Sequence, residues 1–334
     1  MNNSKRHLLN SDNLYRTIRS ADIPEEFAKQ LPAQSIYQII LKRGIASAVE
    51  LIDLCDQSQL QTILDFDLWK RDRIDEDRFF EWLEIGDAED GLKILQMVFA
   101  NVDLKIIGFL VNRYVDVIYL EERSETPPNL NFYSPDGGYT WVKVKLDDTR
   151  KHFLFSRFLA IAFETSTEIF FQILALRLTQ TESMLEESAF EERGRRLSAE
   201  GVPDYEWAKQ LTSKLSLNEA KKMLASHSKI ADPSALRAVA PFAYDSDLPM
   251  PLAEIFRGEN NNDELLGELA LLVNALFVVR GADYRKLEEI EAITSYAKER
   301  LNQGLKKLIQ ESGLDALTIY KAIGLIPIFR VALE

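Results

Sequence analysis

The stretch that decides the fold is HFLFSRFLAIAFETSTEIFFQILALRLTQ, residues 152–180. At the 100° per residue of an α-helix, most of its large apolar side chains fall on one broad face, and others crowd the remaining arc. A helix that is apolar on nearly all sides is typical of a protein core. The pattern therefore predicts one central helix, buried nearly all round. Its polar residues form a narrow stripe: Arg157, Glu164, Glu168 and Gln172.

A membrane span is the obvious alternative for so apolar a stretch. Spanning the hydrocarbon core takes about 20 residues with few or no charges. Here Arg157, Glu164, Glu168 and Arg177 interrupt the apolar run. We therefore expect a core helix and no membrane insertion.

The polar stripe allows two interpretations. It could be an internal binding site, with the Glu164 and Glu168 pair acting as cation ligands or as the general acid of a hydrolase-type enzyme in a dry pocket. It could equally be a buried ion-pair seam, in which Arg157 and neighbouring helices neutralise the two glutamates. The second interpretation is favoured. A di-iron bundle is a separate possibility that has no support, because facing Glu-x-x-His pairs are absent from the sequence.

Composition narrows the function classes. The 334 residues are 46% hydrophobic, enough for a large core, and 53 acidic against 40 basic residues give a net charge of -13. This balance argues against a nucleic-acid partner and against binding to anionic membranes. The single cysteine, Cys55, lies among apolar residues and is expected to be a core thiol. The start, MNNSKRHLLNSDN, lacks the apolar run of a signal peptide, so we expect a cytoplasmic protein.

Turn-forming residues and helix caps along the chain suggest four parts. Residues 1–11 are predicted to be a disordered tail, 12–126 an array of short helices, 127–148 a β-hairpin and 149–334 a helical bundle. The array and the bundle could also be one continuous domain. The expected helix starts include Asp75 as a cap and two capping boxes, Ser47 with Glu50 and Ser216 with Glu219.

The hairpin prediction rests on turn chemistry. A long amphipathic helix is expected over 103–120, and Pro127 and Pro128 follow it. The sequence PDGG at 135–138 is a strong turn signal between two β-type runs. Val142, Val144 and Leu146 would form one face of the hairpin, lying over a helical body.

The C-terminal part contains a second apolar stretch. Residues 263–280, DELLGELALLVNALFVVR, predict a core helix that ends at Gly281, and Asn274 within it needs a hydrogen-bond partner. The Pro- and Asn-rich segment 241–262 is expected to be a mobile loop or lid. The ending IPIFRVALE stops abruptly in apolar sequence, which favours a chain that has been cut short.

An acid-rich run, DFDLWKRDRIDEDRFFEWLEIGDAED at 65–90, invites a metal interpretation. A calcium loop fails because Lys70 stands where the tight turn requires glycine. A water-bearing magnesium site remains an alternative, with the carboxylates Asp72, Asp75, Glu76 and Asp77. The favoured interpretation is a solvated face that pairs with its own cations, Lys70, Arg71, Arg73 and Arg78.

Other chemistry has little support. The three histidines, His7, His152 and His227, have no metal-ligand spacing, and the P-loop, the dinucleotide fingerprint and Gly-x-Ser-x-Gly are absent from the sequence. No cofactor is expected.

Four motifs carry a resemblance: QLQTILDFDLWKRDRIDEDRFFEWLE, SPDGGYTW, RRLSAEGVPDY and the final IFR. Together they resemble a bacterial family of uncharacterised helical proteins, a domain of unknown function, over about residues 31–330. The resemblance implies a helical fold and carries over no activity or site. The short acidic helices at 36–112 are also similar in rhythm to the cytosolic superhelical domain of magnesium transporters.

These patterns predict an all-α protein: a helical array and a helical bundle around a buried central helix, with one small β-hairpin. The expected function is a cytoplasmic interaction or regulatory protein without catalysis, with a protein partner. The alternatives are the magnesium-responsive acidic module and the hydrolase-type enzyme. The sequence does not specify the partner, the ligand or the oligomeric state.

Overall fold

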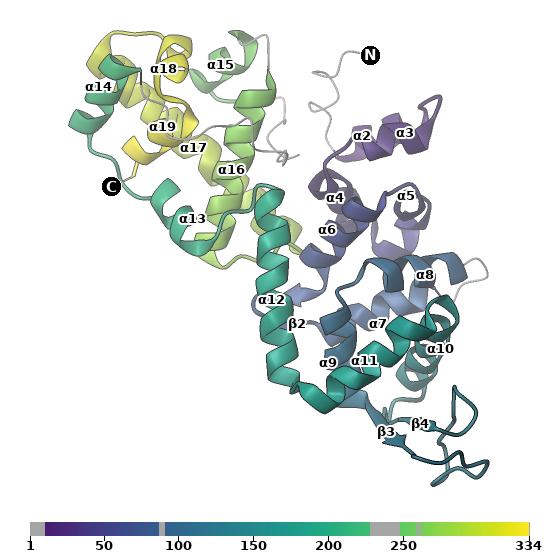
Figure 1. Cartoon of the computed structure of the whole chain (residues 1–334). Coiled ribbons are helices and arrows are strands. Elements are labelled where there is room, and N and C mark those ends of the chain that lie inside the picture. The colour runs from purple at the N-terminus through teal and green to yellow at the C-terminus, as the bar shows by residue number, and fades with distance from the viewer. Residues whose placement is uncertain (1–10, 87–90, 228–247, 259–261, 334) are drawn as a thin grey trace. The chain divides into compact units, whose positions relative to one another are not determined.

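The computed structural model describes residues 11–86, 91–227, 248–258 and 262–333, and its fold is all-α, as predicted (Figure 1). Contacts between Cα atoms group the chain into two compact units. Unit 1 comprises Met1–Ile63 and Gly194–Glu334, and unit 2 comprises Leu64–Arg193. The boundaries between the units fall inside two helices, α6 and α12, whose bounds are Gln57–Asp67 and Glu182–Ala199.

Unit 1 takes its helices from both ends of the chain. The N-terminal ones are α2 (Ser11–Arg19), α3 (Pro24–Lys29), α4 (Ala33–Arg43), the 3-10 helix η1 (Ile45–Ala48) and α5 (Val49–Asp53). The C-terminal ones are α13 (Tyr205–Leu211), α14 (Leu217–Ser226), α15 (Leu252–Gly258), α16 (Asn262–Arg280), α17 (Leu287–Ser312), α18 (Ala316–Ile323) and α19 (Leu325–Val331).

Unit 2 combines helices with two small antiparallel sheets. Its helices are α7 (Glu76–Ile85), α8 (Leu92–Asn101), α9 (Leu104–Tyr114), α10 (Thr149–Thr165) and α11 (Thr167–Thr179). Its strands are β1 (Trp69–Lys70), β2 (Arg73–Ile74), β3 (Val115–Tyr119) and β4 (Thr140–Val144).

This division differs from the predicted ranges 12–126, 127–148 and 149–334, because the first helices pack with the last ones. Gln34 of α4 donates its Nε2 to Oδ1 of Asn274 in α16 at 3.0 Å. Leu41, also in α4, packs against the apolar cluster formed by α16 to α19. Of the predicted tail, residues 1–10 lie outside the described residues, and Ser11 begins α2.

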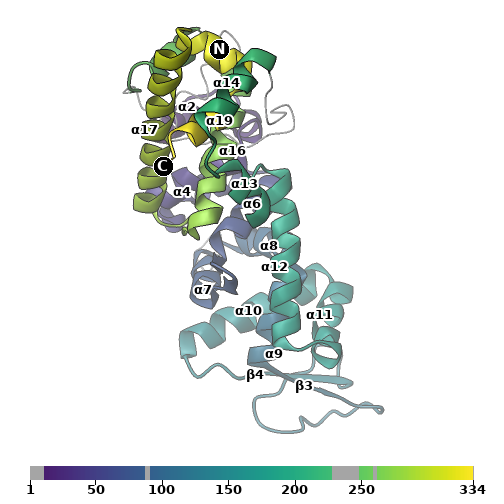
Figure 2. The ribbon, with the colours of Figure 1, turned by 90° about the vertical axis from the view of Figure 1, so that its left-hand side faces the viewer.

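The core of unit 1 is built around α16. As Figure 2 shows, α17 runs alongside α16 and α19, and these three helices contact one another. Gly304 of α17 permits the closest approach, because a Cβ there would collide with the carbonyl oxygen of Ile328 in α19. The prediction of a core helix ending at Gly281, which has a φ of 58°, is confirmed. Its buried apolar residues are Leu265, Leu266, Leu269, Ala270, Leu271, Leu272, Val273, Ala275, Leu276 and Phe277.

Asn274 has the partners that its burial requires. It is fully buried, with 0% exposure. Its Oδ1 accepts from Gln34, and its Nδ2 donates to the carbonyl oxygen of Gly201 at 3.1 Å. The side chain therefore joins α4, α16 and the turn after α12 within unit 1.

The prediction of one buried helix over 152–180 is wrong. The stretch forms two helices, α10 and α11, that part at Ser166, whose φ of -156° and ψ of 99° are extended. The Ser166 hydroxyl accepts from the backbone N–H of Ile169 at 3.3 Å, which caps the second helix. A projection at 100° per residue cannot be carried across such a break.

Of the two helices, α10 supplies the aromatic core of unit 2. The ring of Phe158 lies edge-on to Phe79 of α7 and Phe99 of α8, with centroids 5.4 Å and 6.0 Å away. Phe155 meets Phe80 of α7 in the same way at 6.1 Å. Edge-to-face contacts of this kind add to the burial energy of the rings. One half of the predicted central helix is thus a core element.

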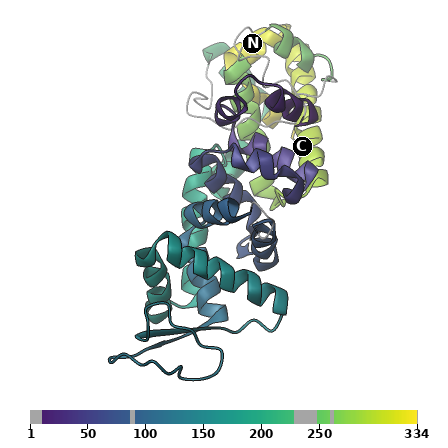
Figure 3. The ribbon, with the colours of Figure 1, turned by 90° about the vertical axis from the view of Figure 1, so that its right-hand side faces the viewer.

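The strands also differ from the prediction. The helix expected over 103–120 ends at Tyr114, and the β-branched run VDVIY then forms β3, which pairs with β4 in the register Val117↔Val142. The expected partner segment contributes a single bridge, Tyr133↔Val142. Figure 3 shows the ribbon of β3 and β4 with its long connecting loop at one end of unit 2. A second sheet pairs Trp69 with Ile74, so one hairpin was too few.

Some of the predicted helix caps are found and one is not. The Asp75 cap is confirmed, with the carboxylate accepting from Arg78 N at 3.1 Å, and so is the capping box of Ser216 and Glu219. The box at Ser47 is wrong, because η1 occupies this position and Ala48 precedes α5 without a side-chain cap. Of the expected loop over 241–262, residues 252–258 form α15, while 241–247 and 259–261 lie outside the described residues.

Within the described ranges, no single helix is long and apolar enough to cross a membrane. The helices α8 and α9 meet that criterion only when taken together, and they are bent by 105° at their junction.

Candidate protein-docking surface

The joint between α10 and α11 brings three phenylalanine rings together. Phe163 near the end of α10 lies 5.4 Å from Phe170 and 6.2 Å from Phe171, and these two rings are 5.5 Å apart. Phe170 is buried, whereas Phe163 and Phe171 are partly exposed. The turn at Ser166 thus presents aromatic surface to solvent.

Along α11 the apolar surface continues. Although the helix is mostly apolar, Phe170, Ile173 and Leu174 are its only buried residues. Phe171, Ala175 and Leu178 are spaced to lie on one side of the helix, and we call them the α11 face. Ala175 is exposed, and Leu178 is 70% exposed.

Polar residues of the predicted stripe border this face. The expectation that they are buried is wrong: Glu164, Glu168 and Gln172 are exposed, and Arg157 is partly exposed. The two glutamates lie on different helices, one on each side of Ser166. Gln172 donates to Glu168 at 3.4 Å, across one turn of α11. The stripe is therefore a solvent-facing acidic border, and a dry pocket around the glutamates is not formed.

The inner side of α11 is fixed against α9. Leu176 packs so closely on Gly108 that a Cβ there would come within 2.8 Å of the leucine Cδ1. Asn112 of α9 donates to the carbonyl oxygen of Gln180 at 2.8 Å. The packed inner side gives the α11 face a defined position in unit 2.

Arg177 adds a polar attachment on the same helix. Its guanidinium donates to the carbonyl oxygen of Val115 and pairs with Asp116 at 3.2 Å. Burial alone would raise the pKa of Asp116, but the hydrogen bonds from Lys145 and Arg177 outweigh it and lower the pKa. The start of β3 is therefore tied to α11 through a charged contact.

The four carboxylates of the magnesium alternative have separate environments. Asp75 caps α7, Asp77 pairs with Lys151 at 2.5 Å, and Asp72 is an exposed residue of the turn between β1 and β2. Glu76 accepts from both Arg113 and Tyr114. Burial and the bond to Glu76 raise the pKa of Tyr114 to about 12.

Among the residues that the structure describes, no group of three or more His, Cys, Asp or Glu side chains is placed to hold a metal ion. The magnesium interpretation stays a prediction. Three of its four carboxylates, those of Asp75, Glu76 and Asp77, accept hydrogen bonds from other groups of the chain.

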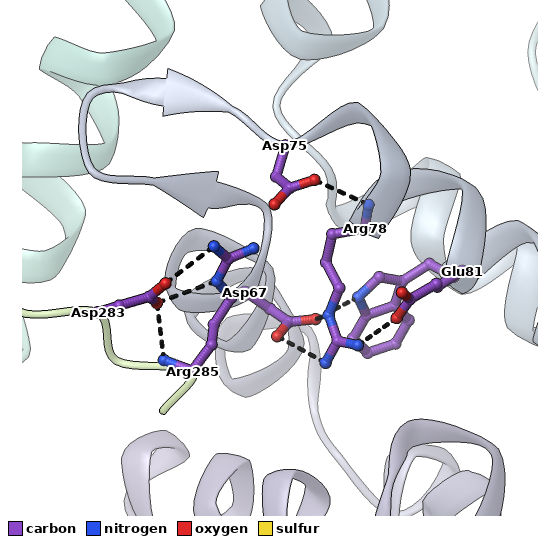
Figure 4. A network of polar contacts seen from close by, with 7 residues as sticks. Asp67, Asp75, Arg78, Glu81, Asp283 and Arg285 are labelled. Carbon is purple, nitrogen blue, oxygen red and sulfur yellow. Dashed lines mark hydrogen bonds and ion pairs between the residues drawn. The ribbon is translucent and has the colours of Figure 1, made fainter. Parts of the chain in front are cut away.

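Arg78 pairs within the acidic run, as expected, but the sequence did not reveal that one of its partners is buried. The carboxylate of Asp67, in LDFDLW, is fully buried and accepts from Arg78 at 2.7 Å and 2.9 Å and from Trp82 Nε1 at 2.7 Å (Figure 4). Burial would lower the pKa of Arg78, but its bonds to Asp67 and Glu81 raise it. The signal was an aspartate flanked by apolar residues. The Asp283–Arg285 pair in the same figure is a local contact of unit 1.

Arg73, expected to pair within the run, pairs elsewhere. It binds Glu186 of α12 at 2.6 Å, and the same carboxylate accepts from the backbone N–H of Ile74 at 3.0 Å. Both contacts lie in unit 2 and hold β2 against α12. The acidic run is therefore a structural element, whereas the α11 face is apolar helix surface that the described residues leave exposed.

Comparison with known proteins gives one match. Residues 6–334 match the model of a family of unknown function, DUF6178. The chain belongs to this family. Membership in DUF6178 confirms the resemblance carried by the four sequence motifs and assigns no activity. No curated protein and no solved structure matches the chain. The likeness of the first helices to magnesium transporters stays a prediction.

Proposed function

We propose that this DUF6178 protein is a non-catalytic interaction protein whose α11 face binds a basic amphipathic helix of a partner protein. The observation that carries the proposal is the exposure of an apolar helix. A helix that is apolar on all sides is ordinarily buried, yet the described residues cover only the inner side of α11. Exposed apolar surface of this kind marks interaction sites.

The spacing of the α11 face suits a helical partner. Phe171, Ala175 and Leu178 form a ridge about two turns long, with the small Ala175 between two large side chains. A partner helix with large apolar residues at i, i+3 or i+4 and i+7 would place one side chain over the alanine. Leu178, a large side chain that is 70% exposed, would lose water-accessible apolar area on binding.

The acidic border specifies the charge of the partner. Both glutamates are exposed: Glu168 lies one turn before Phe171 on α11, and Glu164 follows Phe163 near the end of α10. Lysine or arginine on the flank of the partner helix would meet these carboxylates, and complementary charge speeds association and selects among partners. A second copy of this chain would bring glutamates against glutamates. The complementary occupant is therefore a basic helix, and the net charge of -13 attracts it from a distance.

The remaining parts of the proposal follow from composition. The acidic balance favours a protein partner over nucleic acid. A cytoplasmic location fits a chain whose only cysteine, Cys55, is buried with a thiol pKa raised by burial to about 12.

A fluorescence anisotropy titration tests the proposal. The probe is a labelled amphipathic peptide of about 20 residues, with leucines on one face and lysines on its flanks. We expect micromolar binding to the wild-type chain and at least a tenfold loss with Leu178→Glu. The matched control is Leu130→Glu, since Leu130 is 82% exposed in the loop before β4 and should not change binding. Circular dichroism establishes that both variants are folded.

The charges are tested separately with a swap. The double variant Glu164→Lys and Glu168→Lys should bind the basic peptide less tightly and a glutamate-flanked version more tightly. Equal affinities of the Leu178→Glu and Leu130→Glu variants, or the absence of wild-type binding, would overturn the proposal. Light scattering that shows a dimer dispersed by Leu178→Glu would assign the face to a second copy instead.

A further inference from the structure

Two arginines of unit 1 converge on one tyrosine ring. Arg280, the last residue of α16, has its guanidinium carbon 4.0 Å from the ring centroid of Tyr296 in α17. Arg300, one turn after Tyr296, has its guanidinium carbon 5.3 Å from the same centroid. The ring itself is fixed against Phe329 of α19, with centroids 6.1 Å apart. Both cations therefore share one aromatic neighbour in a defined position.

The hydrogen bonds of these arginines leave donors available. One Nη of Arg300 donates to Gln303 Oε1 at 3.2 Å and to the carbonyl oxygen of Ala332 at 3.3 Å, which sets the orientation of the guanidinium. Its second Nη makes no hydrogen bond to the described residues. Arg280 is exposed, and within the described part of the chain its guanidinium makes no hydrogen bond or ion pair.

Within the described residues, neither Arg280 nor Arg300 forms an ion pair. Other described arginines differ in this respect: Arg113 pairs with Glu76 and Arg285 with Asp283, whereas Arg43, Arg257 and Arg330 form no ion pair within the described residues. Two like charges closer than about 10 Å, the screening length at 0.1 M salt, repel each other. The nearest carboxylate along the chain, Glu299, accepts from Gln303 Nε2 at 3.0 Å and forms no ion pair with either arginine within the described residues.

We propose that Arg280 and Arg300 form a binding site for the phosphate group of a small phosphorylated molecule, held at the edge of the Tyr296 ring. A phosphate group matches the site in charge, because its charge of roughly -1.5 to -2 neutralises two guanidinium groups where a carboxylate neutralises one. Guanidinium forks bind phosphate oxygens in pairs. The edge of an aromatic ring is its positive side and tolerates an anion.

The site is independent of the α11 face, since it lies in unit 1 and uses none of its residues. It would make the chain responsive to a soluble phosphorylated ligand. The fixed Arg300 supplies the preformed half of the site, and Arg280 at the end of α16 supplies the exposed half.

Isothermal titration calorimetry with inorganic pyrophosphate at constant ionic strength tests the site. We expect a dissociation constant on the order of 0.1 to 1 mM, and at least tenfold weaker binding in Arg280→Gln and in Arg300→Gln. Arg300→Lys keeps the charge without the fork and should recover only part of the affinity. The matched control is Arg257→Gln, an exposed arginine of α15 in the same unit, which should bind as the wild type does.

Each contrary result has a defined meaning. No binding by the wild type, equal heats from sodium chloride at the same ionic strength, or equal loss in Arg257→Gln would overturn the site. Binding only to vesicles containing phosphatidic acid would overturn the assignment to a soluble ligand. Glu334, two residues after Ala332, lies outside the described residues, so Glu334→Gln is measured as well. A gain in affinity there would show that the chain's own carboxylate competes for the arginines and would overturn their role as an open site. Arg280 is exposed, so its variant keeps the test valid if Arg300→Gln unfolds.

Discussion

Two helices of nearly the same apolar character, α11 and α16, have opposite environments. In α16 the apolar residues from Leu265 to Phe277 are buried all round. In α11 three residues are buried and Leu178 is 70% exposed. Composition therefore predicted burial for both and was right for one. The difference teaches that an apolar composition on all sides of a helix does not by itself decide whether the helix is buried.

The first prediction compares one leucine from each helix. Leu269→Ala in α16 should lower the free energy of unfolding by about 2 to 5 kcal/mol, because it leaves a cavity in a packed core. Leu178→Ala in α11 should change it by less than about 0.5 kcal/mol, because the side chain is already in water. Urea unfolding followed by circular dichroism measures both.

A large loss with Leu178→Ala would contradict the comparison, since it would show that α11 needs its outer face for the stability of the isolated chain. A small loss with Leu269→Ala would show that α16 is less tightly packed than its burial indicates.

The second prediction concerns the amide inside α16. Asn274→Ala should cost about 1 to 3 kcal/mol, because the Nε2 of Gln34 and the carbonyl oxygen of Gly201 would both lose a buried partner. On α11, Gln172→Ala removes an exposed amide and should leave stability unchanged within about 0.5 kcal/mol. Thermal unfolding of the two variants distinguishes an interior helix from a peripheral one. Equal losses of stability in Asn274→Ala and Gln172→Ala would contradict the claim that one amide is in the interior and the other at the surface.

The third prediction is the smallest and tests how α11 is attached. Because the pKa of Asp116 is lowered in the folded state, its contribution is present above the unfolded value of 3.8 and is lost as the pH falls through the folded value. The carboxylate is 41% exposed, so the contribution at pH 7 should stay below about 1 kcal/mol.

Urea unfolding of the wild type and of Asp116→Asn across pH 2 to 7 should show a stability difference at neutral pH that vanishes at the acid end. The control is Asp72→Asn, an exposed turn residue, which should change the stability at neutral pH by less than about 0.5 kcal/mol. A difference that persists at low pH would mean that Asp116 acts through packing and not through its charge.

What the sequence could predict depended on distance along the chain. The Asp75 cap, the capping box at Ser216 and the end of α16 at Gly281 involve residues within one turn, and all are found. The break at Ser166 is equally local, but the flanking apolar residues concealed it. Pairings across many residues, such as β3 with β4, had no local signature.

The same contrast between local and long-range information applies to the candidate sites. Glu164, Glu168 and Gln172 were recognised as one polar stripe, but their exposure depends on which neighbours α11 has, and the sequence does not state that. Arg280 and Arg300 are twenty positions apart and converge only because α16 and α17 pack together.

The contact between Glu186 and the amide of Ile74 has a consequence for solubility. A two-stranded ribbon such as β1 and β2 has open sides, and an unsatisfied amide on such a side can recruit a strand from another molecule. By accepting that hydrogen bond, a helix side chain stands in for the missing neighbouring strand. The carboxylate of Glu186 thereby protects the ribbon from pairing with another molecule. Without this carboxylate, we expect the protein to precipitate more readily.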